Sequence, residues 1–323
     1  MVIVAPCRSE TLEIREGVFP RSLNPGDVIR VISPAGPVDP VRLEHGIEVI
    51  RGWGYRVEVG RNALHKLDYL AGSDEERLSD LLDACLDEQV RCVICSRGGY
   101  GVMRLLPMIP WAEMAAAPLK HFVGFSDVGA FQLSRLAFTG YGSWSGPQVA
   151  MGLGGAISEA SKTYLRGSLD GSLRVLNWPG DDGLYLRPLR LGSAEGILIP
   201  ICLSILVAML GTPYMPCLKG AVLCLEDTNE APYRIDRMLW QISRSGIIEQ
   251  VAGLVLGRFI YGELDIGGEV EKSVLNHFGD RPFPIWMDLP FGHIDDRPTL
   301  PFGALVSLGL DNRLQLMRIR ESA

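Results

Sequence analysis

Two short apolar runs, each ending abruptly in small or polar residues, constrain the fold of this chain most strongly. The first is Val90–Cys95, which continues into Ser96-Arg-Gly-Gly-Tyr-Gly101, and the second is His121–Phe125, which continues into Ser126-Asp127. Near-continuous apolar runs of this length are typical of buried parallel strands whose carboxyl ends open into loops. We therefore expect two strands of one parallel sheet, with both loops at the same edge of it.

Strand-like and helix-like segments alternate through the first half of the chain. Strands are expected at Val28–Ser33 and Tyr55–Val59, and an amphipathic helix follows the capping box that begins at Ser73. This alternation predicts a doubly wound, mostly parallel α/β domain over residues 21–170. Residues 1–20 have no clear period, and we expect them to form a loosely held extension.

The pattern changes after about residue 170, where turn-forming residues alternate with short strands. We expect residues 171–190 to be a linker and residues 191–323 to form a second, smaller, β-rich α+β domain. In that domain the predicted strand Gly220–Glu226 ends in acidic residues, and the loop Pro290–Asp295 leads to the closing strands. The expected fold class is therefore α/β with two domains.

Residues 196–218 contain no charged side chain, which raises the alternative of a membrane span. Pro200, Gly211 and Pro213 interrupt this stretch, and such residues favour a buried helix over Ile201–Leu210 instead. The N-terminus has no basic segment followed by a long apolar run, so we expect no secretory signal. We therefore expect no membrane partner.

Charge and cysteine content narrow the functional classes further. The net charge is −7 and no basic stripe is present, which argues against a nucleic-acid partner. The seven cysteines have no framework spacing, which favours reduced, buried thiols in a cytoplasmic protein. Cys92 and Cys95 are three apart on a predicted strand and point to opposite faces, so they cannot share a metal. The five histidines show no metal-binding spacing, and we expect neither a metal nor another cofactor.

Three side chains are candidates for chemistry at the predicted sheet edge. Ser126 lies on a strand-to-helix turn, where a hydroxyl is lifted clear and the next N–H faces an oxyanion; a simple helix cap is the alternative. His293 lies in a loop beside a glycine, although a lone loop histidine is usually a solvated bystander. Glu226 ends an apolar strand, where a capping or salt-bridged carboxylate is the alternative. Together they can supply a nucleophile, a base and an orienting acceptor, provided that the two domains meet.

Several segments carry a family resemblance, in order, from about residue 23 to the end of the chain. They are Ser96-Arg-Gly-Gly-Tyr-Gly101, Gly124-Phe-Ser-Asp127, Leu225-Glu-Asp227, Leu289-Pro-Phe-Gly-His-Ile-Asp295 and Leu300-Pro-Phe-Gly303. In these segments the chain resembles the L,D-carboxypeptidase family of serine peptidases, which includes the microcin C self-immunity hydrolases. Each segment alone is a weak signal, whereas the ordered combination is specific.

The resemblance implies a Ser–His–Glu triad. Ser126 would be the nucleophile, His293 the general base and acid, and Glu226 the group that orients the imidazole. The resemblance further implies an oxyanion hole and a set of substrate contacts. The oxyanion donors would be the N–H groups of Gly99 and Asp127, and the substrate contacts Arg97, Tyr100 and Ser145.

The resemblance also implies alternative substrates. The better-known activity of the family is the release of terminal D-alanine from murein tetrapeptides in the cytoplasm. The immunity branch instead cleaves an amide or acyl link in a peptidyl- or aminoacyl-nucleotide. Both branches work without a metal or cofactor and are usually homodimers. A non-catalytic, ligand-binding descendant is the third alternative.

The chain departs from the family pattern at three places. Pro200-Ile-Cys202 stands where the family usually has Gly-Gly-Asn, Ser145 where it usually has histidine, and Gly129 where it usually has threonine. The first departure removes a polar patch that a ligand can approach closely. The triad candidates remain, so we expect hydrolysis or acyl transfer, with a murein-type peptide as the first choice of substrate and another acyl donor as the second.

Overall fold

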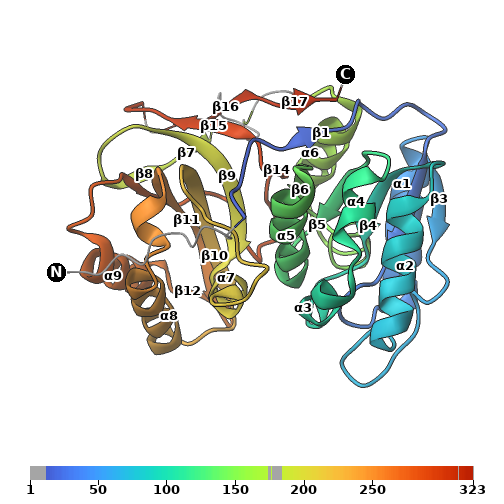
Figure 1. The fold of residues 1–323 in the computed structure, drawn as a ribbon, viewed down its shortest axis with the longest axis horizontal. Coiled ribbons are helices and arrows are strands. Elements are labelled where there is room, and N and C mark those ends of the chain that lie inside the picture. The colour runs from blue at the N-terminus through green and yellow to red at the C-terminus, as the bar shows by residue number, and fades with distance from the viewer. Residues whose placement is uncertain (1–11, 174–175, 177–183, 312, 323) are drawn as a thin grey trace.

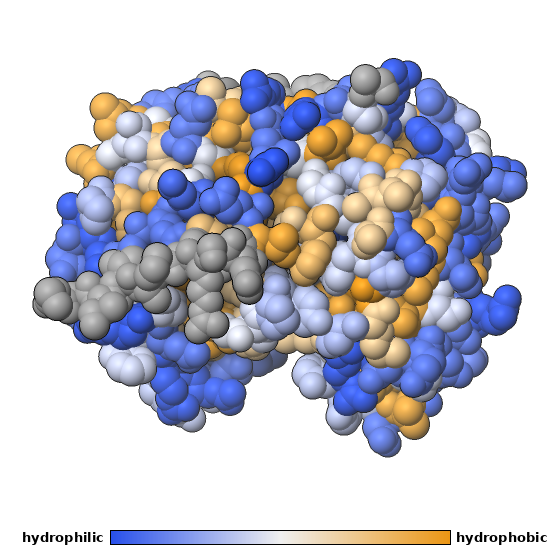
Figure 2. All heavy atoms as spheres, in the orientation of Figure 1, coloured by the Kyte–Doolittle hydropathy of each residue, from blue (hydrophilic) through white to orange (hydrophobic). Residues whose placement is uncertain are grey.

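The computed structural model of the chain describes residues 12–173, 176, 184–311 and 313–322. Two lobes lie side by side, the N-terminal one in blue to green and the C-terminal one mainly in yellow to red (Figure 1). Each lobe is built on its own sheet, which confirms the predicted α/β fold with a second, β-rich lobe. Hydrophilic side chains dominate the face shown in Figure 2, and hydrophobic patches include one along the boundary between the lobes.

Six strands form the N-terminal sheet, in the order β14-β6-β5-β4-β2-β3. All neighbouring strands are parallel except β14, which pairs antiparallel with β6. The predicted strands around Val90 and His121 are both present, and their buried apolar residues show no polar alternation because both faces are covered. The strands are β2 (Val28–Ile32), β3 (Arg56–Val59), β4 (Val90–Cys95), β5 (His121–Gly124), β6 (Ser143–Ser145) and β14 (Leu300–Phe302).

Helices cover both faces of this sheet, which confirms the doubly wound arrangement. Residues of α2 to α5 share one core with Cys95, whereas residues of α1 and α6 share another with Cys92. The two cysteines therefore do point to opposite faces, as predicted. The helical segments are α1 (Pro40–Gly52), α2 (Asp74–Leu86), α3 (Val102–Leu105), η1 (Leu106–Met108), α4 (Trp111–Ala116), η2 (Ser126–Val128), α5 (Gly129–Thr139), η3 (Val149–Leu153) and α6 (Glu159–Asp170).

The C-terminal sheet follows the order β7-β16-β15-β9-β10-β11-β13-β8, and β12 pairs with β11. Its centre, from β9 to β13, is parallel, and its flanking strands are antiparallel. Helices α7, α8 and α9 bury their apolar faces in the same core as α2 to α5. The strands are β7 (Leu184–Tyr185), β8 (Arg187–Arg190), β9 (Ala194–Cys202), β10 (Ala221–Thr228), β11 (Gly253–Tyr261), β12 (Leu264–Asp265), β13 (Ile285–Met287), β15 (Leu305–Leu308) and β16 (Arg313–Arg318). The helical segments are α7 (Leu203–Met209), α8 (Pro232–Arg244), η4 (Ile248–Gln250) and α9 (Gly267–Phe278).

The uncharged stretch 196–218 forms parts of two elements. Its predicted buried helix is α7, whereas its first residues belong to strand β9, which the pattern did not predict. Strand β9 pairs with β15 only over Ala194–Ile197, and Pro200 lies beyond this paired stretch, where the missing N–H of a proline is tolerated. Among the residues that the structure describes, no helix combines the length and the apolar character that crossing a membrane requires.

The described part of the N-terminal extension is not loosely held, so this expectation is wrong for residues 12–20. Strand β1 (Val18–Phe19) pairs in parallel with β17 (Arg320–Glu321). Phe19 is 1% exposed, and its ring centroid lies 5.1 Å from that of Trp144. The expected linker over residues 171–190 falls partly outside the described residues, and it is wrong for residues 184–190, where β7 and β8 belong to the C-terminal sheet.

Five cysteines, at positions 85, 92, 95, 202 and 224, are free and buried, as expected. The expectation of reduced thiols is wrong for Cys217, which is disulfide-bonded. Odd cysteine counts say nothing about which individual thiols are paired, so the sequence offered no sign of this bond.

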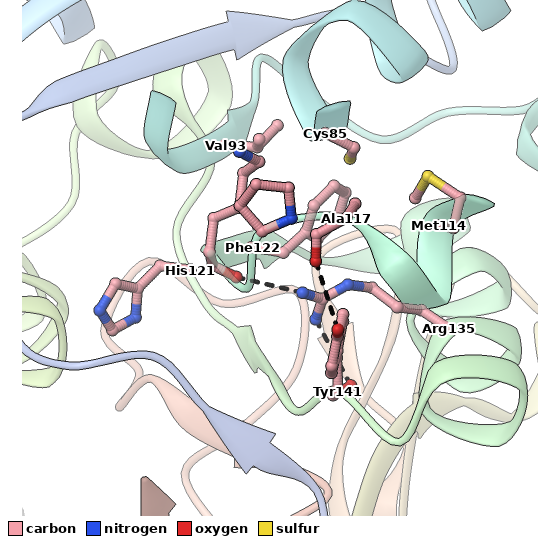
Figure 3. A pocket seen from close by; sticks show the side chains of 10 residues that line it. Cys85, Val93, Met114, Ala117, His121, Phe122, Arg135 and Tyr141 are labelled. Atoms are coloured by element: carbon pink, nitrogen blue, oxygen red, sulfur yellow. Dashed lines mark hydrogen bonds between the residues drawn. The ribbon is translucent and has the colours of Figure 1, made fainter. Parts of the chain in front are cut away.

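Helix α5, which follows Ser126, is anchored by the buried Arg135. Its guanidinium donates to the carbonyls of Lys120 (3.1 Å) and Gly142. Its guanidinium carbon also lies 5.4 Å from the ring centroid of Tyr141, which is within the range of a cation–π contact. Figure 3 shows the two side chains next to each other. Arg135 thereby ties the helix to the strands on either side of it.

Candidate active site

Ser126 lies on the sharp turn between β5 and α5. Its backbone φ is +62°, a conformation that non-glycine residues rarely adopt. Such strain persists only where the surroundings enforce it, and it is typical of a nucleophile on a strand-to-helix turn. Neither η2 nor α5 has a side-chain cap hydrogen bond, so Ser126 does not act as the helix cap that the sequence also allowed.

The glycine loop after β4 packs directly against this turn. A Cβ at Gly98 would lie 2.8 Å from the Cβ of Ser126, so only glycine fits there. Gly99 has φ +119°, and a Cβ on it would lie 3.3 Å from the backbone of Gly36 in the loop after β2. Because the Gly36 N–H also donates to the Gly98 carbonyl (3.1 Å), the two loops form one rigid rim around the serine.

Glu226 lies on β10 and is completely buried. Strand register pairs it with Cys202 at the end of β9, and the Cys202 thiol donates to its Oε1 at 2.7 Å. Burial, followed by the charge of Glu226, raises the pKa of Cys202 well above its usual value, so this thiol is protonated at neutral pH and acts as a donor. One carboxylate oxygen is therefore satisfied from the neighbouring strand, and the other remains for a partner.

The loop that carries His293 is fixed against the strand next to β10. The Arg258 N–H on β11 donates to the Phe291 carbonyl (2.8 Å), and a Cβ at Gly257 would lie only 2.3 Å from that carbonyl oxygen. Gly292 has φ +144°, and a Cβ on it would lie 3.2 Å from Glu226 Oε2. The two glycines thus let the loop approach the carboxylate closely.

The structure brings Ser126, His293 and Glu226 together where the two lobes meet. His293 Nε2 lies 3.0 Å from Ser126 Oγ, and His293 Nδ1 lies 2.8 Å from Glu226 Oε2. The imidazole packs against the ring of Phe125, at a centroid distance of 4.7 Å, and its side chain is 25% exposed. A hydroxyl, an imidazole and a buried carboxylate in this order can perform nucleophilic catalysis.

The buried Arg297 supports the loop that carries His293. The sequence analysis did not identify this arginine. It donates to the carbonyls of Gly292 (3.0 Å) and Ile294 (2.8 Å), on both sides of His293. Its guanidinium lies 4.2 Å from the centre of the Phe125 ring. Burial lowers its pKa to about 10, so it keeps its charge at neutral pH beside Glu226. The only signal was an arginine shortly after the histidine, which no spacing rule singles out.

Asp127 has a structural side chain and a backbone N–H beside the nucleophile. The side chain is 2% exposed, and its Oδ2 accepts a hydrogen bond from the Val102 N–H (2.9 Å) at the start of α3. Burial raises the pKa of Asp127 to about 6. Its N–H lies in the first turn of η2, where backbone donors lack intrahelical partners.

The three predicted substrate contacts lie in different surroundings. Arg97 is half-buried, its Nη1 donates to the Pro37 carbonyl (3.0 Å), and its buried Nε has no hydrogen-bond partner in the described part of the chain. Tyr100 is exposed and makes an edge contact with the exposed Tyr69, at a centroid distance of 5.7 Å. Ser145 is 2% exposed within β6, paired with Gly124 and Leu300. The structure thus leaves Arg97 and Tyr100 accessible near the glycine loop, and buries Ser145.

Comparison with known families agrees with this architecture. The family model of the LD-carboxypeptidase N-terminal domain matches residues 29–146, and that of the C-terminal domain matches residues 195–308. The chain belongs to the LD-carboxypeptidase family of serine peptidases, and it is a carboxypeptidase enzyme.

Several relatives are similar over almost their whole length. A putative carboxypeptidase of Streptomyces coelicolor is 37% identical, over 92% of this chain and 95% of the relative. The murein tetrapeptide carboxypeptidase of Pseudomonas aeruginosa is 30% identical, over 89% of this chain and 94% of the relative. Among solved structures, the muramoyltetrapeptide carboxypeptidase from Oxalobacter formigenes is 31% identical with a TM-score of 0.76, covering 90% of this chain and 97% of that one. The microcin C7 self immunity protein MccF has a TM-score of 0.84 at 20% identity, covering 94% of this chain and 100% of that one, and supports the fold alone.

Proposed function

We propose that this enzyme hydrolyses the amide bond to a C-terminal D-amino acid in a murein-type peptide, with Ser126 as nucleophile, His293 as general base and acid, and Glu226 as the orienting carboxylate. The observation that carries the proposal is the chain of two hydrogen-bond distances, 3.0 Å from Ser126 Oγ to His293 Nε2 and 2.8 Å from His293 Nδ1 to Glu226 Oε2. These two hydrogen bonds give the serine proton a direct path to the imidazole.

The reaction would follow the acyl-enzyme route. His293 Nε2 takes the proton of Ser126 as Oγ attacks the scissile carbonyl, and the imidazolium that forms is stabilised by Glu226. His293 then gives this proton to the nitrogen of the leaving D-amino acid, and the C–N bond breaks. A water molecule next attacks the acyl-enzyme by the same proton path in reverse, which releases the shortened peptide and restores Ser126.

The oxyanion donors in this proposal are the N–H groups of Gly99 and Asp127. The support is that Gly99 belongs to the rigid rim and that the Asp127 N–H follows the nucleophile directly, in the first turn of η2. Backbone donors held in this way need no reorganisation when charge develops on the carbonyl oxygen.

Arg97 is the proposed anchor for the terminal carboxylate of the peptide. A carboxypeptidase must recognise that carboxylate, and arginine binds one with two parallel hydrogen bonds. Arg97 lies in the loop after β4 with an unpartnered buried Nε, and it forms no ion pair within the described ranges. Tyr100 follows in the same loop, and its exposed ring offers a flat apolar contact for the peptide.

The choice of substrate rests on the relatives. Two proteins named for murein or muramoyl tetrapeptide carboxypeptidase activity are 30% and 31% identical to this chain over most of its length. MccF, which has been solved with aspartyl sulfamoyl adenosine, is only 20% identical. We therefore rank an acyl-nucleotide substrate second. A homodimer working in the cytoplasm remains part of the proposal.

The test compares release of the terminal residue from three substrates: a murein tetrapeptide ending in D-alanine, the same peptide ending in L-alanine, and an aminoacyl-adenylate. We expect turnover of the first alone, and loss of it by at least about 10⁴-fold in Ser126→Ala. Ser307→Ala, a half-buried serine on β15, is the matched control and should retain full activity. Faster turnover of the aminoacyl-adenylate would replace the murein proposal with the acyl-nucleotide one.

A further inference from the structure

The buried carboxylate of Glu226 lies between two different metal-binding groups. Its Oε1 accepts the thiol proton of Cys202 at 2.7 Å, and its Oε2 lies 2.8 Å from His293 Nδ1. The ligand atoms of the three side chains lie within 4.8 Å of one another. Besides Ser126, a catalytic triad needs only the carboxylate and the imidazole, so the thiol is an additional feature of this site.

These three side chains match the ligands that zinc prefers. A thiolate, an imidazole and a carboxylate are each common zinc ligands, and three protein ligands leave a fourth position for water. In a tetrahedral zinc site a sulfur and a nitrogen ligand are about 3.6 Å apart, so the side chains need to move by only about 1 Å.

The surroundings hold these ligands in place. Cys202 and Glu226 are fixed by the register of β9 and β10, and His293 by a loop that is hydrogen-bonded to β11. Cys202 is 4% exposed and Glu226 is fully buried, whereas the His293 side chain is 25% exposed. A site with pre-positioned ligands needs little ordering when the ion binds.

We propose that Cys202, Glu226 and His293 bind one Zn²⁺ ion and that this ion switches the hydrolase off. Zinc forms bonds to Cys202 Sγ, a Glu226 oxygen and His293 Nδ1. The thiol proton leaves to solvent, and the imidazole stays neutral because it loses its Nδ1 proton and gains one at Nε2. Nε2 then carries a hydrogen, so it can no longer accept the proton of Ser126.

The metal site stands on the three ligands alone, whereas the inhibition rests on the proposed function. The experiment therefore needs a readout of binding that does not depend on turnover. Cobalt(II) supplies it, because it occupies zinc sites and a cobalt–thiolate bond adds a near-ultraviolet charge-transfer absorption. The full chain is titrated with Co²⁺, together with Cys202→Ser and the control Cys85→Ser, which removes another free, buried thiol.

We expect one Co²⁺ per chain with a thiolate band in the wild type and in Cys85→Ser, and no band in Cys202→Ser. Zinc should displace the cobalt and inhibit peptidase activity at one equivalent. A chelator should reverse this inhibition. Cys202→Ser, compared with its own zinc-free rate, should need at least about tenfold more zinc. A thermal melt establishes that this nearly isosteric variant is folded.

Two results would overturn the proposal: no thiolate band in the wild type, or a band that persists in Cys202→Ser. If the band appears as expected while the wild type releases no D-alanine, the metal site stands and the proposed function fails. If hydrolysis proceeds at its full rate with zinc bound, the inhibitory role is wrong.

Discussion

His293 Nε2 lies 3.0 Å from Ser126 Oγ, although the two residues are 167 positions apart in the sequence. The serine comes from the turn after β5 in one lobe, and the histidine from the loop after β13 in the other. Both loops are fixed by backbone hydrogen bonds and by glycines that allow close approach. The site therefore depends on the packing of the two lobes as much as on either sheet.

Replacing Glu226 by glutamine should leave the fold intact and remove most of the activity. The amide keeps the size of the side chain but can donate to His293 Nδ1, which favours the wrong imidazole tautomer. We expect kcat to fall by about 10³–10⁴-fold, with a smaller change in KM. The rate of labelling of Ser126 by a fluorophosphonate should fall in parallel. Labelling at the wild-type rate would mean that Glu226 does not control the base.

The Gly98→Ala substitution should disturb the nucleophile itself. The new Cβ would lie 2.8 Å from the Ser126 Cβ, so the serine must shift relative to His293. We expect kcat/KM to fall by about 10²-fold, because catalysis is sensitive to displacements of this size. Gly268→Ala on α9 is the control, since a Cβ there meets nothing within 4 Å. It should leave activity unchanged and stabilise the helix by about 0.5–1 kcal/mol.

The free energy of unfolding should depend on pH because Asp127 titrates at a different pH in the folded and unfolded states. Burial raises its pKa to about 6 in the folded chain, against about 3.9 when unfolded. Between these values the folded state binds more protons than the unfolded state, so the contribution of Asp127 to stability falls as pH rises through this window. The expected loss is about 2 kcal/mol between pH 4 and pH 7.

The Asp127→Asn variant isolates this pH dependence because its side chain does not titrate but retains an acceptor for the Val102 N–H. Urea denaturation of both proteins across this pH range gives the free energies of unfolding. We expect the difference between them to shift by about 2 kcal/mol in favour of the variant as pH rises. A difference that stays constant with pH would contradict the prediction.

Removing Arg135, which anchors α5, should lower the free energy of unfolding more than it lowers catalytic activity. Arg135→Met fills much of the same space but leaves the carbonyls of Lys120 and Gly142 without their donor. We expect a loss of about 2–3 kcal/mol in the free energy of unfolding. Arg61→Met, at an exposed arginine, should change stability by less than about 0.5 kcal/mol. Equal effects in the two variants would mean that the buried guanidinium contributes nothing.

Local patterns predicted most of the first lobe. Val90–Cys95 and His121–Gly124 are buried strands because an uninterrupted apolar run has few other stable positions, and the capping box at Ser73 marks the observed start of α2. Local patterns did not predict a strand whose pairing partner lies far away in the sequence. Val18–Phe19 is too short to be recognised as a strand, and only its partner at the other end of the chain makes it one.

The three residues Ser126, His293 and Glu226 were nominated from their local surroundings and a family resemblance, and the structure brings them together. Cys202 was noted only as a departure from the family pattern, because its contact with Glu226 depends on the register of two strands and not on sequence spacing. Arg297 was missed for a similar reason, since its partners are carbonyls and an aromatic face that no motif describes.

Strand β14 comes from residues 300–302 yet completes the edge of the N-terminal sheet beside β6. The polypeptide therefore passes into the second lobe and returns to the first before it ends. A fragment that stops after the first lobe would expose the bare edge of β6, and a fragment that starts after it would carry a strand with no sheet to join. Complementation by two separately expressed halves should succeed only when both are present during folding.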